Sequence, residues 1–139
     1  MLVRVRVKIL RADTLLAYTA TVRHGLMTVL ETPSFQREAA ALLTGAEHAE
    51  LIGFLAANPE AGNIIPGPGG VRKLRWAAGG KGKRGGTRVI YYYHNESVPL
   101  FLLHVYGKSE KDNLLKAELN EMRRLVPRLV SGYQRRRKK

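Results

Sequence analysis

Cysteine is absent from this 139-residue chain, and acidic residues are scarce. Without cysteine there is no disulfide framework and no thiolate metal site, which fits a reducing compartment such as the cytoplasm. No apolar run approaches the roughly 20 residues of a membrane helix. The chain holds 24 Lys and Arg against 11 Asp and Glu, a net charge of +13. This excess favours nucleic acid as a partner, with an anionic membrane surface or an acidic protein as alternatives.

The shortage of acid is sharpest between Ala61 and Asn95, a stretch without Asp or Glu. The same stretch holds seven basic residues: Arg72, Lys73, Arg75, Lys81, Lys83, Arg84 and Arg88. A surface of one sign attracts a polyanion, so this stretch is the expected contact with nucleic acid. Three of the seven cations lie among the glycines of residues 79–86, which predicts a loop that follows a phosphate backbone.

Residues 1–26 look like an addition to the main domain. Residues 1–10 alternate between apolar and basic side chains, which is typical of a strand with one apolar and one basic face. Met27 offers a second start of translation, and unpacked termini tend to be disordered. We therefore predict a dispensable extension, with an added edge strand of the sheet as the alternative.

Two short helices are expected after this segment. Thr32 followed by Pro33 is typical of an N-cap and the first helical position. Thr44 and Glu47 have the spacing of a capping box and predict the start of a second helix. Pro59 then ends that helix.

Three strands are expected next, over residues 71–76, 88–93 and 100–106. In the first strand, alternation places Leu74 and Trp76 on one face and Lys73 and Arg75 on the other. If the apolar face packs on the helices, the two cations face a groove. Three strands in a meander behind two helices predict an α+β domain with a small antiparallel β-sheet.

A C-terminal helix should begin between residues 109 and 113. Its packing stripe consists of Leu115, Leu119, Met122 and Val126, which are spaced by 4, 3 and 4 residues. Pro127 should kink or end it. We accordingly place the main domain at residues 27–130 and expect residues 131–139 to be a solvated basic tail.

The residue types also restrict the chemistry. Cleavage of RNA by its own 2′-hydroxyl needs a proton acceptor, a proton donor and charge stabilisation of the phosphorane. The basic stretch lacks a carboxylate cluster for Mg²⁺, so neither a metal nor another cofactor is expected. A lysine crowded by cations could accept the proton, because its charged form is disfavoured. The candidates are Lys73, Lys81, Lys83 and Lys108.

Aromatic and histidine side chains offer further candidates. Tyr91 or Tyr93 would stack on an RNA base, although core packing is an equal alternative for two of the three tyrosines at residues 91–93. His94 and His104 form a second acid–base hypothesis, which is disfavoured because one lies at a turn and the other in an apolar strand. His48 is interpreted as an exposed polar residue.

The order of three sequence runs makes the chain similar to a known family. The runs are GGVRKLRW, GKGKRGGTRVIYYY and LFLLHVYGKSEKDNL. Together they resemble the RelE superfamily of toxins from type II toxin–antitoxin modules, and most closely its HigB-like branch. The resemblance implies a small antiparallel sheet with two N-terminal helices and a C-terminal helix. It also implies metal-independent cleavage of mRNA in the ribosomal A site.

The resemblance further implies site residues and partners. The catalytic basic pair of the family falls on Lys73 and Arg75, the arginine of the next strand falls on Arg88, and the last basic residue falls on Lys108. The catalytic tyrosine of RelE has no match, because leucines occupy that region. The implied partners are mRNA on the ribosome and a cognate antitoxin, usually with a helix-turn-helix domain; no membrane partner is implied.

Three functions remain open at this point. The first is a ribosome-dependent endoribonuclease, with Arg72, Lys81, Lys83, Arg84, Tyr91 and Tyr93 as further RNA contacts. The second is a ParE-like toxin that inhibits a protein target such as gyrase, against which the dense basic groove argues. The third is a basic RNA-binding protein without catalysis.

Overall fold

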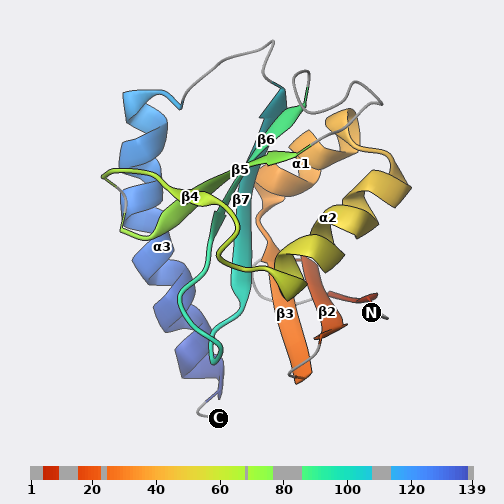
Figure 1. Cartoon of the computed structure of the whole chain (residues 1–139). Coiled ribbons are helices and arrows are strands. Elements are labelled where there is room, and N and C mark those ends of the chain that lie inside the picture. The colour runs from red at the N-terminus through yellow and green to blue at the C-terminus, as the bar shows by residue number, and fades with distance from the viewer. Residues whose placement is uncertain are drawn as a thin grey trace.

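The structure is a computed structural model of the whole chain (Figure 1). It describes the backbone of residues 5–9, 16–22, 25–67, 69–76, 86–107 and 114–137. Side chains are described for residues 27–67, 69–76, 86–107 and 114–134. Across these residues, no helix has both the length and the apolar character that a bilayer span requires.

The described strands form one mixed sheet in the order β1-β2-β3-β7-β6-β5-β4. Their bounds are β1 Val5–Ile9, β2 Leu16–Val22, β3 Gly25–Glu31, β4 Asn63–Ile64, β5 Val71–Trp76, β6 Thr87–Tyr92 and β7 Leu100–Gly107. Neighbouring strands are antiparallel except β3 and β7, which run parallel from Val29↔Leu100 to Glu31↔Leu102. The predicted α+β class and the β5-β6-β7 meander are confirmed. The predicted small antiparallel sheet is present as the β4-β5-β6-β7 part, to which β3 adds a parallel pair on the free side of β7.

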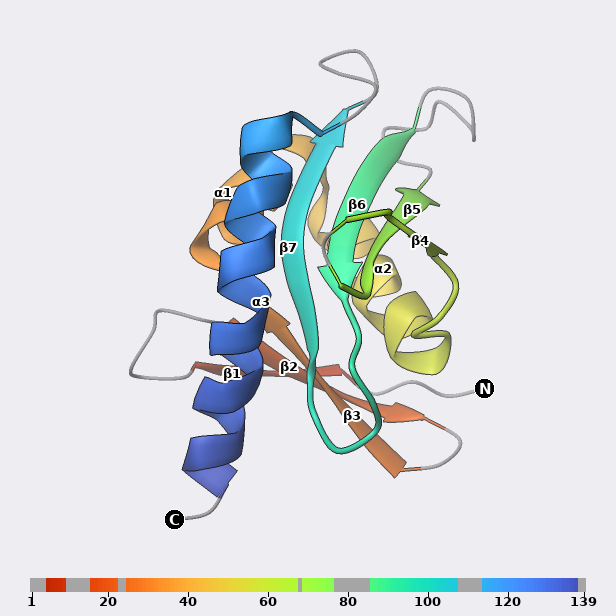
Figure 2. The same cartoon turned by 90° about the vertical axis from the view of Figure 1, so that its left-hand side faces the viewer.

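Helices cover both faces of this sheet. Helix α1 spans Pro33–Leu42 and α2 spans Gly45–Ala57 on one face, while α3, Lys116–Arg137, crosses the other (Figures 1 and 2). The N-cap predictions are confirmed. The Thr32 hydroxyl accepts a hydrogen bond from Phe35 N, and Thr44 with Glu47 forms a complete capping box.

Two hydrophobic clusters hold the helices to the sheet. The α1/α2 cluster includes Phe35, Leu51 and Leu55 from the helices and Val89 and Tyr91 from β6. The α3 cluster is made of Ile90, Phe101, Leu103, Tyr106, Met122, Val126 and neighbouring apolar residues. Leu74 and Trp76 pack against the α1/α2 cluster, whereas Val71 belongs to the α3 cluster. The alternation predicted for β5 is therefore confirmed.

The structure bears on two predictions about the ends of the chain. Helix α3 continues through Pro127 to Arg137, so the helix does not end at the proline, which is one of the two outcomes that the sequence predicts. Residues 5–9 and 16–22 form β1 and β2, which is the edge-strand alternative of the sequence. Helix α2 lies against β1, β2 and β3, so these strands are part of the packed molecule.

Candidate active site

Three basic side chains are placed on the α3 face of the sheet. Lys73 and Arg75 alternate with Leu74 and Trp76, which pack against the α1/α2 cluster on the opposite face. Arg88 stands directly across from Arg75 in the β5-β6 register. Residues opposite each other in an antiparallel pair share a face. The sheet therefore brings Lys73, Arg75 and Arg88 together, as the sequence predicts.

The Arg75–Arg88 pair is electrostatically unusual. Arg75 is exposed, but Arg88 is only 7% exposed, and its Nη1 has no hydrogen-bond partner among the described residues. Like charges directly opposite on two strands repel each other, and a buried cationic nitrogen without an acceptor is costly. Both costs fall when an anion lies between the guanidinium groups. The sequence placed Arg88 outside the core, which is wrong because β6 is buried along its whole length.

A bulge adds Tyr106 to this row. The β6-β7 register shifts between Ile90 and Tyr91, so that Tyr106 of β7 lies opposite Arg88. Leu103 and Tyr106 both belong to the α3 cluster although they are three residues apart, a spacing that regular alternation would not give. Tyr106 therefore completes the row Arg75–Arg88–Tyr106. The sequence carries no local signal for this bulge, and Tyr106 was not among the predicted site residues.

The start of α1 stabilises the bulged part of β7. Strand β3 ends at Glu31, opposite Leu102 of β7. In the next residue, Thr32 N donates to Leu102 O at 3.1 Å and the Thr32 hydroxyl donates to Leu103 O at 3.0 Å. Farther along, Glu38 Oε1 accepts from Val105 N at 3.2 Å. These bonds satisfy backbone groups that would otherwise be an open sheet edge. They also hold the segment that leads to Tyr106.

The histidines are not brought together. His104 Nδ1 lies 3.1 Å from Glu38 Oε1, and His94 Nδ1 lies 2.9 Å from the Tyr92 hydroxyl. These contacts occupy each ring with a separate partner at a different place on the sheet. A paired-histidine mechanism therefore has no support in the geometry.

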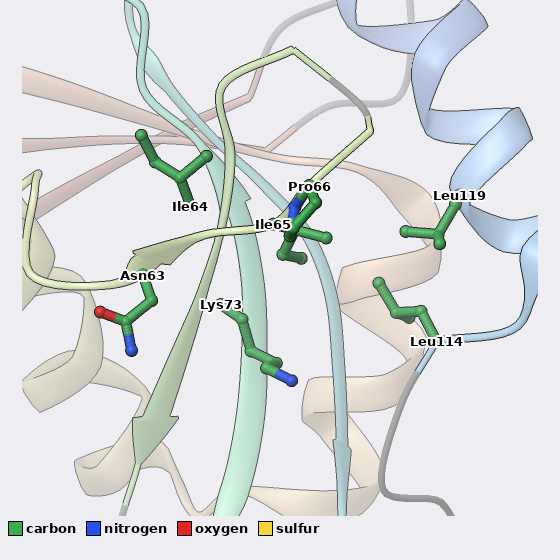
Figure 3. Close-up of a pocket in the computed structure, with 7 residues that line it drawn as sticks. All are labelled: Asn63, Ile64, Ile65, Pro66, Lys73, Leu114 and Leu119. Carbon is green, nitrogen blue, oxygen red and sulfur yellow. The ribbon is translucent and has the colours of Figure 1, made fainter.

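Lys73 points into a pocket beside Arg75 and Arg88, the two arginines that are called the cationic row from here on. The pocket has a volume of about 370 Å³ and lies between β4, β5 and the start of α3. In Figure 3 the Lys73 side chain lies between Asn63 of β4 and Leu114, which precedes α3. Asn63 is directly opposite Lys73 in the β4-β5 register. The ammonium group thus enters a pocket whose other walls are mostly apolar.

The side chains of Arg72 and Tyr91 hold a loop of the fold in place and do not belong to the cationic row. Arg72 Nη1 donates to the backbone oxygens of Glu60 and Gly62, at 3.1 and 2.8 Å. The Tyr91 hydroxyl donates to Pro59 O and accepts from Gly62 N, both at 2.8 Å. Both side chains therefore clamp the loop after α2, and Tyr91 is fully buried, so neither faces the side of the sheet that carries Arg75 and Arg88.

Gly62 explains why that loop can lie so close to Tyr91. A Cβ atom at this position would come within 2.9 Å of the Tyr91 ring and 3.0 Å of Lys73 O. A side chain would therefore displace the loop, β5 or the tyrosine. Glycine allows the close approach that sets the start of β4 and, with it, one wall of the Lys73 pocket.

The tyrosines at residues 91–93 are protonated phenols at neutral pH. Burial raises the pKa of Tyr91, although the Gly62 amide and the Arg72 charge act in the opposite direction. Burial also raises the pKa of Tyr92, and burial together with Glu96 and Glu60 raises that of Tyr93. Tyr93 packs against the α1/α2 cluster, on the face opposite the cationic row. None of the three is placed as a proton acceptor for chemistry at Arg75 and Arg88.

Four predicted site residues lie outside the described residues: Lys81, Lys83, Arg84 and Lys108. The described ranges contain no group of three or more His, Asp or Glu side chains arranged to hold a metal ion. Of the predicted residues that are described, Lys73, Arg75 and Arg88 share one face, whereas Arg72, Tyr91 and Tyr93 belong to the other side of the sheet.

Fold and site together define a small basic α+β domain that carries Lys73, Arg75 and Arg88 on one face of its sheet. The family model described as the RelE toxin of the RelE/RelB toxin–antitoxin system matches residues 27–136. The chain belongs to the RelE toxin family, as its sequence runs predict. Toxins of this family are generally endoribonucleases that are paired with an antitoxin.

Proposed function

We propose that this RelE-family toxin, of the HigB-like branch, cleaves mRNA in the ribosomal A site by attack of the RNA 2′-hydroxyl, without a metal ion. The observation that carries the proposal is the Arg75–Arg88 pair, in which two arginines stand directly opposite each other on β5 and β6 and one of them is buried. A scissile phosphate between them would relieve their repulsion and supply the acceptor that Arg88 Nη1 lacks within the described residues.

The arrangement favours the transition state over the bound substrate. Negative charge builds up on the phosphorane oxygens as the 2′-oxygen attacks, and donors held in place by a sheet need no reorganisation. Arg88 is fixed by burial on both sides of β6, whereas Arg75 approaches from solvent. The pair thus combines a rigid donor with an accessible one.

We assign proton transfer to the lysines of this face. Lys73 lies two residues from Arg75 on the same side of β5, about 7 Å along the strand. It can therefore approach the 2′-hydroxyl while the arginines hold the phosphate. Lys108, which the family resemblance adds, remains a candidate for the second proton transfer, and Lys81, Lys83 and Arg84 remain proposed contacts to the RNA backbone.

The proposed regulator is a cognate antitoxin with a helix-turn-helix domain. The toxin family implies an antitoxin, and the net charge of +13 favours an acidic surface on it. Complex formation would keep the cationic row from the ribosome.

Alanine variants of the full-length chain test the catalytic assignment. Lys73→Ala, Arg75→Ala and Arg88→Ala should each reduce cleavage of ribosome-bound mRNA on the order of 10²-fold, because each removes a contact that strengthens in the transition state. Arg128→Ala, which removes an exposed arginine of α3, is the matched control and should cleave like the parent. Circular dichroism and thermal unfolding check that the variants are folded.

The products test the mechanism. Cleavage should leave a 2′,3′-cyclic or 3′-phosphate, because the attacking oxygen belongs to the RNA, and it should survive treatment of the toxin stock with EDTA. A 3′-hydroxyl product would contradict attack by the 2′-oxygen. Full toxicity of the triple alanine variant would favour the ParE-like alternative, in which the target is a protein.

A further inference from the structure

The Lys73 pocket has walls that the proposed cleavage step does not use. Ile65 and Pro66 form one side, Leu114 and Leu119 form the other, and the carboxamide of Asn63 stands at the edge; the Ile64 side chain points away from Lys73 (Figure 3). Solvent reaches these walls, since Pro66 is exposed and Ile65, Leu114 and Leu119 are half-buried. An exposed apolar hollow beside a cationic site is a typical place for a ligand.

We propose that this pocket binds one nucleobase of the RNA strand whose phosphate lies at Arg75 and Arg88, and that it sets the base preference of cleavage. The proposal rests on the proposed ribonuclease function. It makes Asn63 and Leu119 determinants of specificity, a role distinct from stabilising the transition state.

Continuity with the cationic row is the first argument for a nucleobase. Lys73 belongs both to the pocket and to the face that carries Arg75 and Arg88. A ligand that spans the pocket and the row must combine an apolar part with an anionic part separated by about 7 Å, the repeat of a strand face. A nucleotide has this composition, since its base and its phosphate lie at opposite ends of one sugar.

The lining chemistry is the second argument. Aliphatic side chains on two opposite walls can hold the flat faces of a base, as apolar side chains do in pockets for unstacked bases. Asn63 offers one donor and one acceptor from its carboxamide, the combination that pairs with the edge of a base. Because Asn63 is opposite Lys73 in the register, the polar contacts lie together on the β4-β5 side.

The two walls of the pocket come from separate elements, which makes the pocket suitable for selecting one RNA base over another. Residues 63–66 come from the short edge strand β4 and its loop, whereas Leu114 and Leu119 come from the chain before and within α3. Ile65 N donates to Val71 O at 2.8 Å, which ties the loop to β5. The pocket width is therefore set by two elements that are each anchored independently of the ligand.

Mapping of cut sites in a purified translation system tests the proposal. The parent should prefer particular bases at one position next to the cut. Asn63→Ala should reduce this preference about 10-fold, within the range of one good bidentate base contact, while cleavage continues. Leu119→Trp should fill the pocket and reduce both the rate and the preference. Leu115→Trp is the matched control, because Leu115 is 64% exposed and does not line the pocket, and it should behave like the parent.

Each outcome bears on the proposal separately from the ribonuclease function. An absence of cuts by the parent would contradict the proposed function itself. Cuts without any base preference next to the cleaved bond would overturn the base pocket alone. The base pocket would also be overturned if folded Asn63→Ala and Leu119→Trp variants kept the rate and the base preference of the parent. In that case the apolar walls would be explained as a contact surface for a protein partner.

Discussion

Glu31 and His48 show how a single pair of side chains can secure the frame of the site. Glu31 ends β3, its side chain is 1% exposed, and its Oε2 is hydrogen-bonded to Nε2 of His48 in α2. The sequence interpretation of His48 as an exposed polar residue is therefore wrong. The pair joins α2 to the strand that leads into Thr32 and α1, whose hydrogen bonds hold the bulged part of β7.

Removal of His48 should destabilise the protein. His48→Ala takes one hydrogen-bond partner from the buried Glu31 carboxylate, and loss of such a partner typically costs about 1–3 kcal/mol. Urea denaturation of both proteins measures the change. The double variant Glu31→Gln/His48→Ala should recover part of the loss, because a neutral amide is easier to bury. Equal stability of parent and His48→Ala would show that the pair contributes nothing.

At the level of elements, α3 contains an unusual residue for a helix interior. Pro127 lies in the middle of Lys116–Arg137, lacks an N–H for the Arg123 carbonyl, and is exposed. The helix continues because Met122, Val126 and their neighbours bury an apolar stripe against the sheet on both sides of the proline. Tertiary packing thus outweighs a local preference, which is why the helix does not end at Pro127.

Replacement of Pro127 by alanine should stabilise α3. Alanine restores the missing hydrogen bond and is up to about 3 kcal/mol more favourable than proline inside a helix, although it also frees the unfolded chain. We expect a higher midpoint of thermal unfolding and more helical circular dichroism. Arg124→Ala, which changes another exposed residue of α3, is the control for changes to the local surface. A lower midpoint would mean that proline is needed for the packing of α3.

The strands before residue 27 belong to the sheet, yet the domain should not depend on them. The pairing that joins β3 to β7 begins at Val29, so this link does not involve the residues before Met27. The match to the RelE family also begins at residue 27. A chain that starts at Met27 should therefore fold and retain toxicity. Aggregation of this shorter chain, with the full chain soluble, would show that β1 and β2 are needed to cover β3.

For the whole molecule, the distribution of charge matters more than the net value of +13. The cations between Ala61 and Asn95 meet no acid from their own stretch, and three of them converge on one face of the sheet. Glu60, just before this stretch, pairs with Arg72 on the other side of the sheet. The face that carries Lys73, Arg75 and Arg88 is thus the part of the described surface best suited to a polyanion.

Binding to the ribosome or to RNA should accordingly weaken steeply with salt. Displacement of counterions makes the logarithm of affinity fall linearly with the logarithm of salt concentration, by roughly 0.7 for each single-strand phosphate contact. Replacement of Lys73, Arg75 and Arg88 together should reduce this slope by roughly 2. Titration of fluorescent single-stranded RNA at several salt concentrations measures it. An unchanged slope would show that this face is not the contact surface.

Much of the local structure was predictable from the sequence because its causes are local. Hydrogen-bonding side chains at Thr32, Thr44 and Glu47 determine where two helices begin. Alternation in β5 determines that Lys73 and Arg75 share a face, and the order of the basic and tyrosine runs indicates the RelE family. These features depend on residues a few positions apart, so periodicity and capping rules suffice.

Only the tertiary structure decided which of those residues lie together in the candidate site. Arg72 and Tyr91 face a loop that needs them as a clamp, and Arg88 is buried because both neighbours of β6 are in place. A bulge turns Tyr106 toward Arg88, and the Lys73 pocket closes between segments some fifty residues apart. Such features arise from contacts between distant parts of the chain, whose geometry no local pattern specifies. The sequence by itself determined the elements and the sign of the charge; the packing of the sheet between its helices determined where that charge is concentrated.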